Sequence, residues 1–146
     1  PAIDYGRGHP FVFQVFAAPW MDGDAVAAHL NRLNVPAIRF APIRYEATEG
    51  LYKGSTVQGI RLEVAESPVY RPACAMMHIL RLLTDLYGIK RIWNAEGSRP
   101  AFFDKLLGSR QPRDALLAGT PPQQIADDWE PALRAFDAFI TPEFSH

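Results

Sequence analysis

The hydrophobic pattern near the N-terminus predicts a buried strand. Residues 11–16 are apolar at five of six positions and rich in β-forming residues. Such a run is typical of a strand buried on both faces, so we expect a central strand over 11–17. Pro19 should end it, because proline has no N–H for a ladder of hydrogen bonds.

Two further strands are predicted downstream. Residues 57–65 alternate between apolar and charged side chains, a pattern of one dry and one wet face. Residues 37–47 form the second run, in which Pro42 favours an edge position or a bulge. The polar loop over 48–56 joins the two runs, and we expect them to pair antiparallel.

Helical periodicity fills the rest of the chain. Asp22 to Asp24 supply an N-cap for a helix over 25–33, which Asn34 to Pro36 end. The longest helix should run from Pro72 to Tyr87, with Gly88 as its stop. Shorter helices are predicted over 101–107 and 112–118, and residues 89–100 should be irregular, with a possible short strand at 92–93. The apolar stripes expected to face the core are Val26, Leu30 and Leu33 in the first helix and Met76, Ile79, Leu80, Leu83 and Leu86 or Tyr87 in the longest.

The C-terminal region carries a last apolar stripe. Ile125, Trp129, Leu133, Phe136 and Ile140 recur at three- and four-residue spacing. Pro131 interrupts this stripe, so we expect a kink or two abutting helices, with Trp129 buried beside it. Across the whole chain, the residues predicted to lie in the core are Phe13, Val15, Leu62, Met76, Leu80 and Leu83.

These elements predict an α+β fold, a small sheet with at least one antiparallel pair that is covered by helices. A length of 146 residues fits a single domain over 1–146 with a real core. The chain begins at Pro1 rather than methionine, and we interpret it as either a processed product or a piece cut from a larger protein.

Composition narrows the function classes. The net charge is −1, with 15 basic and 16 acidic residues well mixed, which argues against nucleic-acid binding. Apolar runs are too short for a membrane span. The single cysteine, Cys74, excludes an internal disulfide and is expected to be an inert core residue. No spacing of histidines or cysteines suggests a metal site, and no cofactor motif occurs.

The candidate binding site is the loop before the first predicted strand. Arg7 lies between Gly6 and Gly8, and small neighbours let a ligand approach the backbone. A guanidinium presents a planar fork of donors that suits a carboxylate or sugar oxygens, although a structural arginine is the competing interpretation. Tyr5 and His9 flank it. Tyr52 and Lys53, on the loop over 48–56, complete the candidate substrate-binding set, with a solvated surface loop as the alternative. Trp20 is more simply explained as a core or interdomain residue.

Several segments resemble the C-terminal domain of the NamZ-type exo-β-N-acetylmuramidases, bacterial cell-wall glycosidases long known as a domain of unknown function. The segments are Gly6-Arg7-Gly8 with Phe13 and Ala18-Pro19-Trp20 at this spacing, residues 52–64 (YKGSTVQGIRLEV), residues 103–109 (FDKLLGS) and residues 125–131 (IADDWEP). The family loop usually reads Gly-Arg-Gly-Thr, whereas His9 stands at the last position here. Over 52–64 the family often has an acidic residue, a cysteine and a histidine, whereas this chain has Ser55, Val57 and Glu63.

The resemblance implies a function for the parent protein. Such an enzyme would release N-acetylmuramic acid from the non-reducing ends of peptidoglycan fragments, and this domain would form one wall of the cleft. A glycosidase uses paired carboxylates, but no pair stands out here, so no catalytic residue is assigned and the chain by itself should be inactive. The resemblance favours a C-terminal domain cut from a larger two-domain protein, and it places the catalytic acid in the N-terminal domain of that protein. It also implies a place of action outside the cytoplasm. The alternative is a non-enzymatic module that binds a glycan, a peptide or another subunit.

Overall fold

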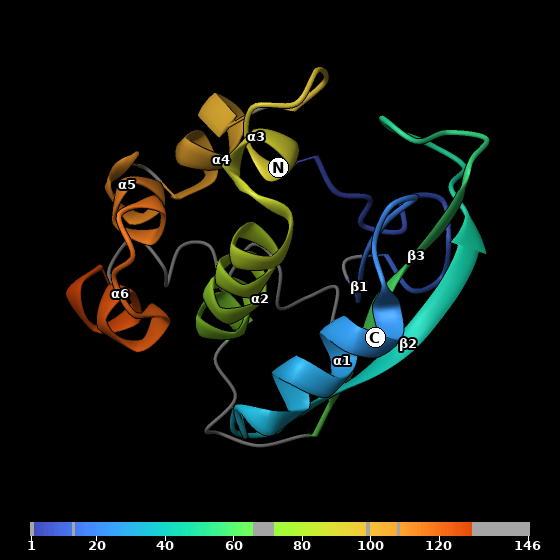
Figure 1. Ribbon diagram of the computed structural model, residues 1–146. Helices are drawn as coiled ribbons and strands as arrows, with labels where there is room; N and C mark the ends of the chain where they lie inside the picture. Colours follow the sequence, from blue (N-terminus) through green and yellow to red (C-terminus); the bar gives the residue numbers. More distant parts are fainter. Residues whose placement is uncertain (1, 13, 66–71, 99, 108, 130–146) are drawn as a thin grey trace. The chain divides into compact units, whose positions relative to one another are not determined.

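The computed structural model describes residues 2–12, 14–65, 72–98, 100–107 and 109–129. These residues belong to two compact units. The sheet unit comprises the described residues from 3 to 65, and the helical unit comprises residue 2 and those from 72 to 129. Both are shown in Figure 1. The predicted single domain over 1–146 stays a prediction, and each unit is treated by itself below.

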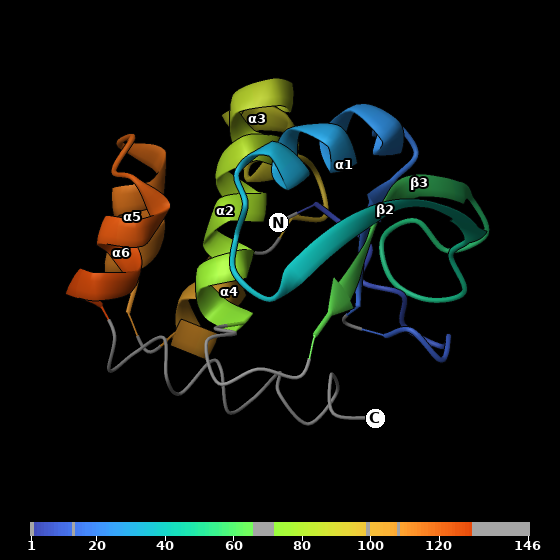
Figure 2. The ribbon, with the colours of Figure 1, turned by 90° about the horizontal axis from the view of Figure 1, so that it is seen from below.

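The sheet unit is built on an antiparallel sheet. In the described residues β1 (Val15–Ala18), β2 (Ile38–Glu46) and β3 (Thr56–Val64) pair in the order β1-β3-β2. The register pairs Phe40 with Leu62 on one side of β3 and Phe16 with Ile60 on the other. The predicted antiparallel pair and the α+β class are therefore confirmed. The sheet is long along β2 and β3 and short along β1 (Figure 2).

Pro42 lies on an edge strand, as predicted. The register is continuous through its pairing with Ile60, so the strand has no bulge at this position. An edge strand leaves one row of backbone groups outside the ladder, and a residue without an N–H is tolerated there.

Helix α1 (Gly23–Arg32) covers one face of the sheet and packs against β2 and β3. Its N-cap is Asp22, whose carboxylate accepts a hydrogen bond of 3.1 Å from the Ala25 N–H. Asn31 joins the helix to β2, because its side chain both donates to and accepts from the Phe40 backbone. Val26 and Leu30 are buried as predicted. Leu33 is not, since it is the C-cap residue and is 52% exposed.

The first strand differs from the prediction in length and position. It begins at Val15, because the residues before it form turns in which the Val12 N–H donates to His9 and the Gln14 N–H to Phe11. The predicted run from 11 to 17 and its central place are therefore wrong: β1 is at the edge and β3 is central. All of β1 is nevertheless buried. Burial on both faces does not require a neighbouring strand on both sides, because other parts of the chain can cover the faces.

The helical unit consists of helices around α2 (Pro72–Tyr87), whose bounds match the prediction. The other described helices are α3 (Ile89–Ile92), α4 (Pro100–Leu107), α5 (Gln111–Leu117) and α6 (Pro122–Asp128). Helix α2 packs against α3, α5 and α6. Its predicted stripe is buried at Met76, Ile79, Leu80 and Leu83, whereas Leu86 is 44% exposed. Cys74 is buried, which agrees with a core residue.

The short strand predicted at 92–93 is wrong. Gly88 has φ of 90° and is the N-cap of the single-turn helix α3. The buried residues Ile92 and Trp93 therefore lie at the end of a helix and not in a strand. The Trp93 indole donates 3.0 Å to the Thr84 hydroxyl, which in turn donates 2.6 Å to the Leu80 carbonyl. Satisfying the indole N–H in this way allows complete burial of a large aromatic residue.

An ion pair ties α4 to α5. Arg113 binds both carboxylate oxygens of Asp104, at 2.9 and 2.8 Å, and both side chains are largely buried. Further along the chain, Trp129 is half-buried at the C-cap of α6 rather than buried as predicted. The expected kink at Pro131, the rest of that stripe and Phe13 lie outside the described residues.

Candidate functional site

The predicted site residues come together at one end of the sheet unit. Residues 5–9, named here the arginine loop, follow a bridge between Asp4 and Ala17 of β1. The turn between β2 and β3, residues 47–55, contributes the other predicted positions. The N-terminal segment runs beside the sheet in Figures 1 and 2. A hydrogen bond of 2.7 Å from the Thr48 hydroxyl to the Arg7 carbonyl joins the loop to the turn.

Both glycines of the arginine loop are required by its geometry. Gly6 has φ of 79° and Gly8 has φ of 84°, in the left-handed region that favours glycine. A Cβ on Gly6 would lie 2.8 Å from Cγ2 of Val15, and one on Gly8 would lie 2.3 Å from Oγ1 of Thr48. The loop backbone therefore lies in close contact with β1 and the turn, and a larger residue than glycine would not fit at these two positions.

Arg7 projects from this tightly held backbone. Its side chain is exposed. Among the described residues, no hydrogen bond or ion pair involves its guanidinium. The structural interpretation, in which the guanidinium ties carbonyls or acids together, thus finds no support in the described part of the chain. An arginine that is fixed at its backbone and free at its head is suited to a planar anionic ligand.

The buried carboxylate of Asp4 is hydrogen-bonded to the backbone of the arginine loop. Asp4 is 7% exposed, and its Oδ2 accepts hydrogen bonds from the Gly6 N–H at 3.0 Å and the Tyr45 hydroxyl at 2.6 Å. Burial, with the hydrogen bond to Asp4 and its charge, raises the pKa of Tyr45 far above the ordinary tyrosine value. Burial and, to a lesser degree, the Asp4 charge likewise raise the pKa of Tyr5. Both phenols therefore stay neutral at physiological pH.

His9 is bound into the same structure. Its Nε2 donates to the Glu46 carbonyl at 2.8 Å, which assigns the proton to that nitrogen. The ring stacks on Phe11 at 4.7 Å between centroids and meets Tyr45 edge-on at 5.1 Å. With one nitrogen and one ring face occupied, His9 is suited to shaping the loop, and a direct ligand contact by this residue stays a prediction.

Tyr52 and Trp20 meet beside the turn. The Trp20 indole donates to the Tyr52 hydroxyl at 3.3 Å. Tyr52 also packs with Tyr45 on the cluster of Ala17, Ala47 and Val57. Both aromatic residues are half-buried, whereas Lys53 is exposed in the turn. The predicted set therefore shares one end of the sheet unit, although no contact between Lys53 and Arg7 is observed in the described residues.

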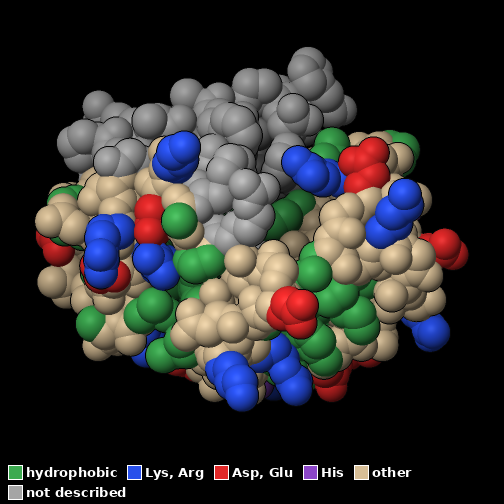
Figure 3. All heavy atoms as spheres, turned by 90° about the horizontal axis from the view of Figure 1, so that it is seen from above, with side chains coloured by type: hydrophobic (Ala, Val, Ile, Leu, Met, Phe, Trp, Pro, Cys, Tyr) green, Lys and Arg blue, Asp and Glu red, His purple; other side chains and the backbone are tan. Residues whose placement is uncertain are grey.

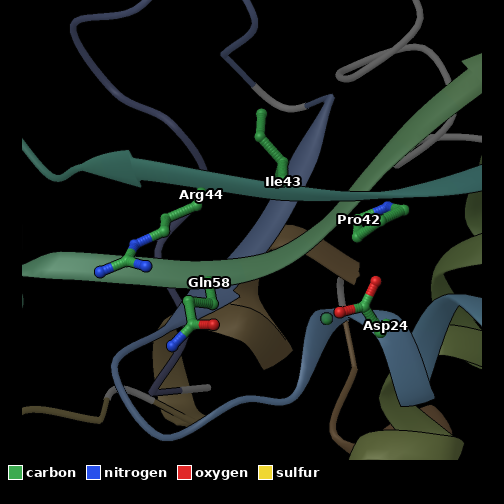
Figure 4. Close-up of a pocket in the computed structure, with 6 residues that line it drawn as sticks. Asp24, Pro42, Ile43, Arg44 and Gln58 are labelled. Carbon is green, nitrogen blue, oxygen red and sulfur yellow. The ribbon is translucent and has the colours of Figure 1, made fainter.

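Two hollows on the described surface lie away from the predicted site residues. One of about 250 Å³ is lined on the α1 side of the sheet by Gly23, Asp24, Pro42, Ile43, Arg44 and Gln58. Figure 4 shows Asp24 on α1 facing the strands that carry Arg44 and Gln58. None of the predicted site residues lines either hollow.

Sequence reasoning missed three residues of this region, Asp4, Tyr45 and Thr48. Asp4 and Thr48 each form a hydrogen bond with the backbone of the arginine loop, and the Tyr45 hydroxyl donates to Asp4. The bonds of Tyr45 and Thr48 each span 41 positions of the chain. An acidic residue two positions before a glycine is a weak local signal for a turn cap. Tyr45 and Thr48 carry no local signal, because the pattern of residues in a strand or turn does not indicate which distant residue a side chain will contact.

The described residues show neither a metal cluster nor a spanning helix. No group of three or more histidine, cysteine or acidic side chains is placed to hold a metal ion within the described ranges. No helix in that part of the chain is long and apolar enough to cross a membrane. On the face shown in Figure 3, basic and acidic side chains are interspersed rather than separated by sign.

Comparison with known proteins decides the family. The family described as exo-beta-N-acetylmuramidase NamZ, C-terminal, matches residues 2–142. This chain belongs to that family. The NamZ C-terminal family carries the name of a peptidoglycan-related hydrolase, which agrees with the resemblance seen in the sequence. No curated protein sequence gives a significant match.

A solved structure shares the fold. The crystal structure of a DUF1343 family protein from Bacteroides fragilis matches with a TM-score of 0.75 and 21% sequence identity. The match covers 92% of this chain but 37% of the solved chain. At this identity the likeness establishes the fold of the NamZ C-terminal chain, while the activity and partners of a whole protein require separate evidence.

Proposed function

We propose that this chain is the C-terminal domain of a peptidoglycan exo-β-N-acetylmuramidase and that its arginine loop forms one wall of the active-site cleft. The observation that carries the proposal is the exposed guanidinium of Arg7 on a backbone fixed by Asp4 and Thr48. N-acetylmuramic acid carries a lactyl carboxylate, and a guanidinium binds a carboxylate through two parallel hydrogen bonds. Membership of the NamZ C-terminal family supports the same substrate class.

The remaining predicted residues would support this contact. Gly6 and Gly8 would let the loop pack closely on β1 and the turn, and His9 would help to keep the loop conformation. Tyr5, Tyr52 and Lys53 would border the bound saccharide. Aromatic rings offer apolar faces to sugar C–H groups, and an ammonium offers donors to hydroxyl oxygens.

The catalytic acid would come from elsewhere in the parent protein. Glycosidases use two carboxyl groups about 5–10 Å apart across the scissile bond. No such pair stands out in the sequence, and two of the described carboxylates have structural partners, since Asp22 caps α1 and Asp104 pairs with Arg113. We therefore propose an N-terminal catalytic domain in the same parent protein. We also propose an extracytoplasmic place of action, because peptidoglycan lies outside the cytoplasm.

The test is a pair of arginine variants in the full-length parent protein. Arg7→Lys keeps the charge but removes the planar fork of donors. The value of kcat/KM on a chromogenic N-acetylmuramide should therefore fall, by an amount that corresponds to a loss of about 1.5–3 kcal/mol in transition-state stabilisation. The melting temperature should change little, because the side chain is exposed. Arg39→Lys, on an exposed residue next to the start of β2, is the matched control and should leave both quantities unchanged.

Other outcomes are informative. Unchanged kcat/KM in Arg7→Lys would remove Arg7 from the site, and a collapsed melting temperature would make it a structural arginine. The purified 146-residue chain should give no turnover above a buffer blank. Turnover by that chain would contradict the proposal that another domain supplies the acid. A parent protein without hydrolase activity that still binds glycans or peptides would favour the non-enzymatic module.

A further inference from the structure

Asp4 is an unusual residue to find beneath an exposed loop. It is 7% exposed, and burying a carboxylate is costly unless hydrogen bonds compensate. Both bonds to its side chain described above converge on the single oxygen Oδ2. A Cβ on Gly50 would lie 3.9 Å from Oδ1, so the turn lies near the other oxygen.

The backbone of Asp4 is as firmly held as its side chain. Its N–H donates to the Ala17 carbonyl at 2.7 Å, and its own carbonyl accepts from the Ala17 N–H at 3.0 Å. Asp4 is thus part of the sheet through its backbone and part of the arginine loop through its carboxylate. Any displacement of the loop must break the bond to Gly6, the residue directly before Arg7.

The Tyr45 hydroxyl fixes the orientation of the carboxylate. Tyr45 comes from β2 and is braced by edge-on contacts with Phe11 and His9, at 5.1 Å in both cases. A short bond of 2.6 Å to a charged acceptor is stronger than one between neutral groups. The chain of contacts therefore runs from a strand, through a phenol and a carboxylate, to the N–H of Gly6.

We infer that Asp4 is the positioning residue of the arginine loop, setting the direction in which Arg7 meets an anionic saccharide without touching that saccharide. The inference rests on the proposed function, because it assigns Asp4 an effect on Arg7 as a ligand-binding group. A purely structural role for Asp4 would stabilise the fold but would act independently of Arg7.

The first measurement needs no ligand. Hydrogen–deuterium exchange of the full-length parent protein, followed in peptides that cover residues 5–9, reports the Gly6 bond. Asp4→Asn should speed exchange there by about tenfold, because an amide oxygen binds the N–H more weakly than a carboxylate. Asp22→Asn makes the same chemical change at a carboxylate that also accepts a backbone N–H, and should leave residues 5–9 unaffected. Unchanged exchange in Asp4→Asn would overturn the inference.

The second measurement is a double-mutant cycle on kcat/KM for a chromogenic N-acetylmuramide. If Asp4 acts through Arg7, Asp4→Asn should lower kcat/KM about tenfold in the wild-type background but less than twofold in the Arg7→Lys background. Equal losses in both backgrounds would show a merely structural residue and overturn the inference. Tyr45→Phe, which removes the hydroxyl and keeps the ring, serves the same cycle where Asp4→Asn does not fold.

The two proposals fail in distinguishable ways. If Arg7→Lys leaves kcat/KM unchanged, the proposed function fails and the inference fails with it. If Arg7→Lys lowers kcat/KM but Asp4→Asn and Tyr45→Phe do not, the inference fails and the proposed function stands. Loss of activity in Asp4→Asn, with the expected coupling to Arg7 and an unchanged melting temperature, supports both.

Discussion

Substitution of Gly8 by alanine should weaken the arginine loop by two separable effects. Gly8 has φ of 84°, and holding an L-residue in the left-handed region costs about 1–2 kcal/mol. The new Cβ would also lie 2.3 Å from Oγ1 of Thr48, so that hydroxyl must move away. Its 2.7 Å bond to the Arg7 carbonyl is then lost, at about 0.5–1.5 kcal/mol. Gly8→Ala should therefore lower the free energy of unfolding by about 1.5–3.5 kcal/mol.

Urea unfolding of four variants, Gly8→Ala, Gly54→Ala, Thr48→Ala and the Gly8→Ala/Thr48→Ala double variant, separates these effects. Gly54→Ala is the matched control, because Gly54 has φ of 85° but no atom within 4 Å of an added Cβ, and it should lose only the conformational share of about 1–2 kcal/mol. In a Thr48→Ala background the clash disappears, so Gly8→Ala should again cost about 1–2 kcal/mol. If Gly8→Ala costs no more than Gly54→Ala, or as much with alanine at 48 as with threonine, the argument for close contact is refuted.

Other substitutions test the core and the buried phenol. Leu80→Ala should cost about 2–5 kcal/mol in denaturant melts, because Leu80 is fully buried on α2, and a loss under about 1 kcal/mol would show that this helix face is misassigned. Gly23→Ala should destabilise by about 1–3 kcal/mol, since its Cβ would lie 2.2 Å from the Gly59 carbonyl oxygen, and an increase in stability would contradict that contact. The raised pKa of Tyr45 contributes stability below about pH 10 that is lost as the pH rises above this value, so Tyr45→Phe should flatten the alkaline decline in unfolding free energy, and identical slopes would count against it.

The sequence determined most of the elements of this protein. Alternation predicted β3, the loop over 48–56 predicted its antiparallel pairing with β2, and Pro72 and Gly88 marked the bounds of α2 to the residue. Capping chemistry placed the N-cap of α1 within Asp22 to Asp24, although the helix begins at Gly23 rather than at residue 25. These features depend on neighbours in the chain, which local patterns report. The loop around Arg7 was also found from sequence, because glycines on both sides of a charged residue are visible without a structure.

Tertiary contacts decided the rest. The run at 11–16 indicated a central strand, yet β1 is an edge strand whose two faces are both buried. A hydrophobic run reports only that its faces are covered, and strand order depends on which segments cover them. Likewise, Trp93 reaches the core from a helical turn rather than a strand, since a two-residue apolar pair has no periodicity.

The hydrogen bonds that fix the backbone of the arginine loop were likewise decided by the tertiary structure. Tyr45 meets Asp4, and Thr48 meets Arg7, across 41 positions of sequence in each case. Propensity and periodicity act over a few residues, whereas these hydrogen bonds exist only once the sheet brings the end of β2 beside the N-terminal segment. The sequence therefore predicted Arg7 as the candidate for binding an anion, and the fold determined how firmly its backbone is held.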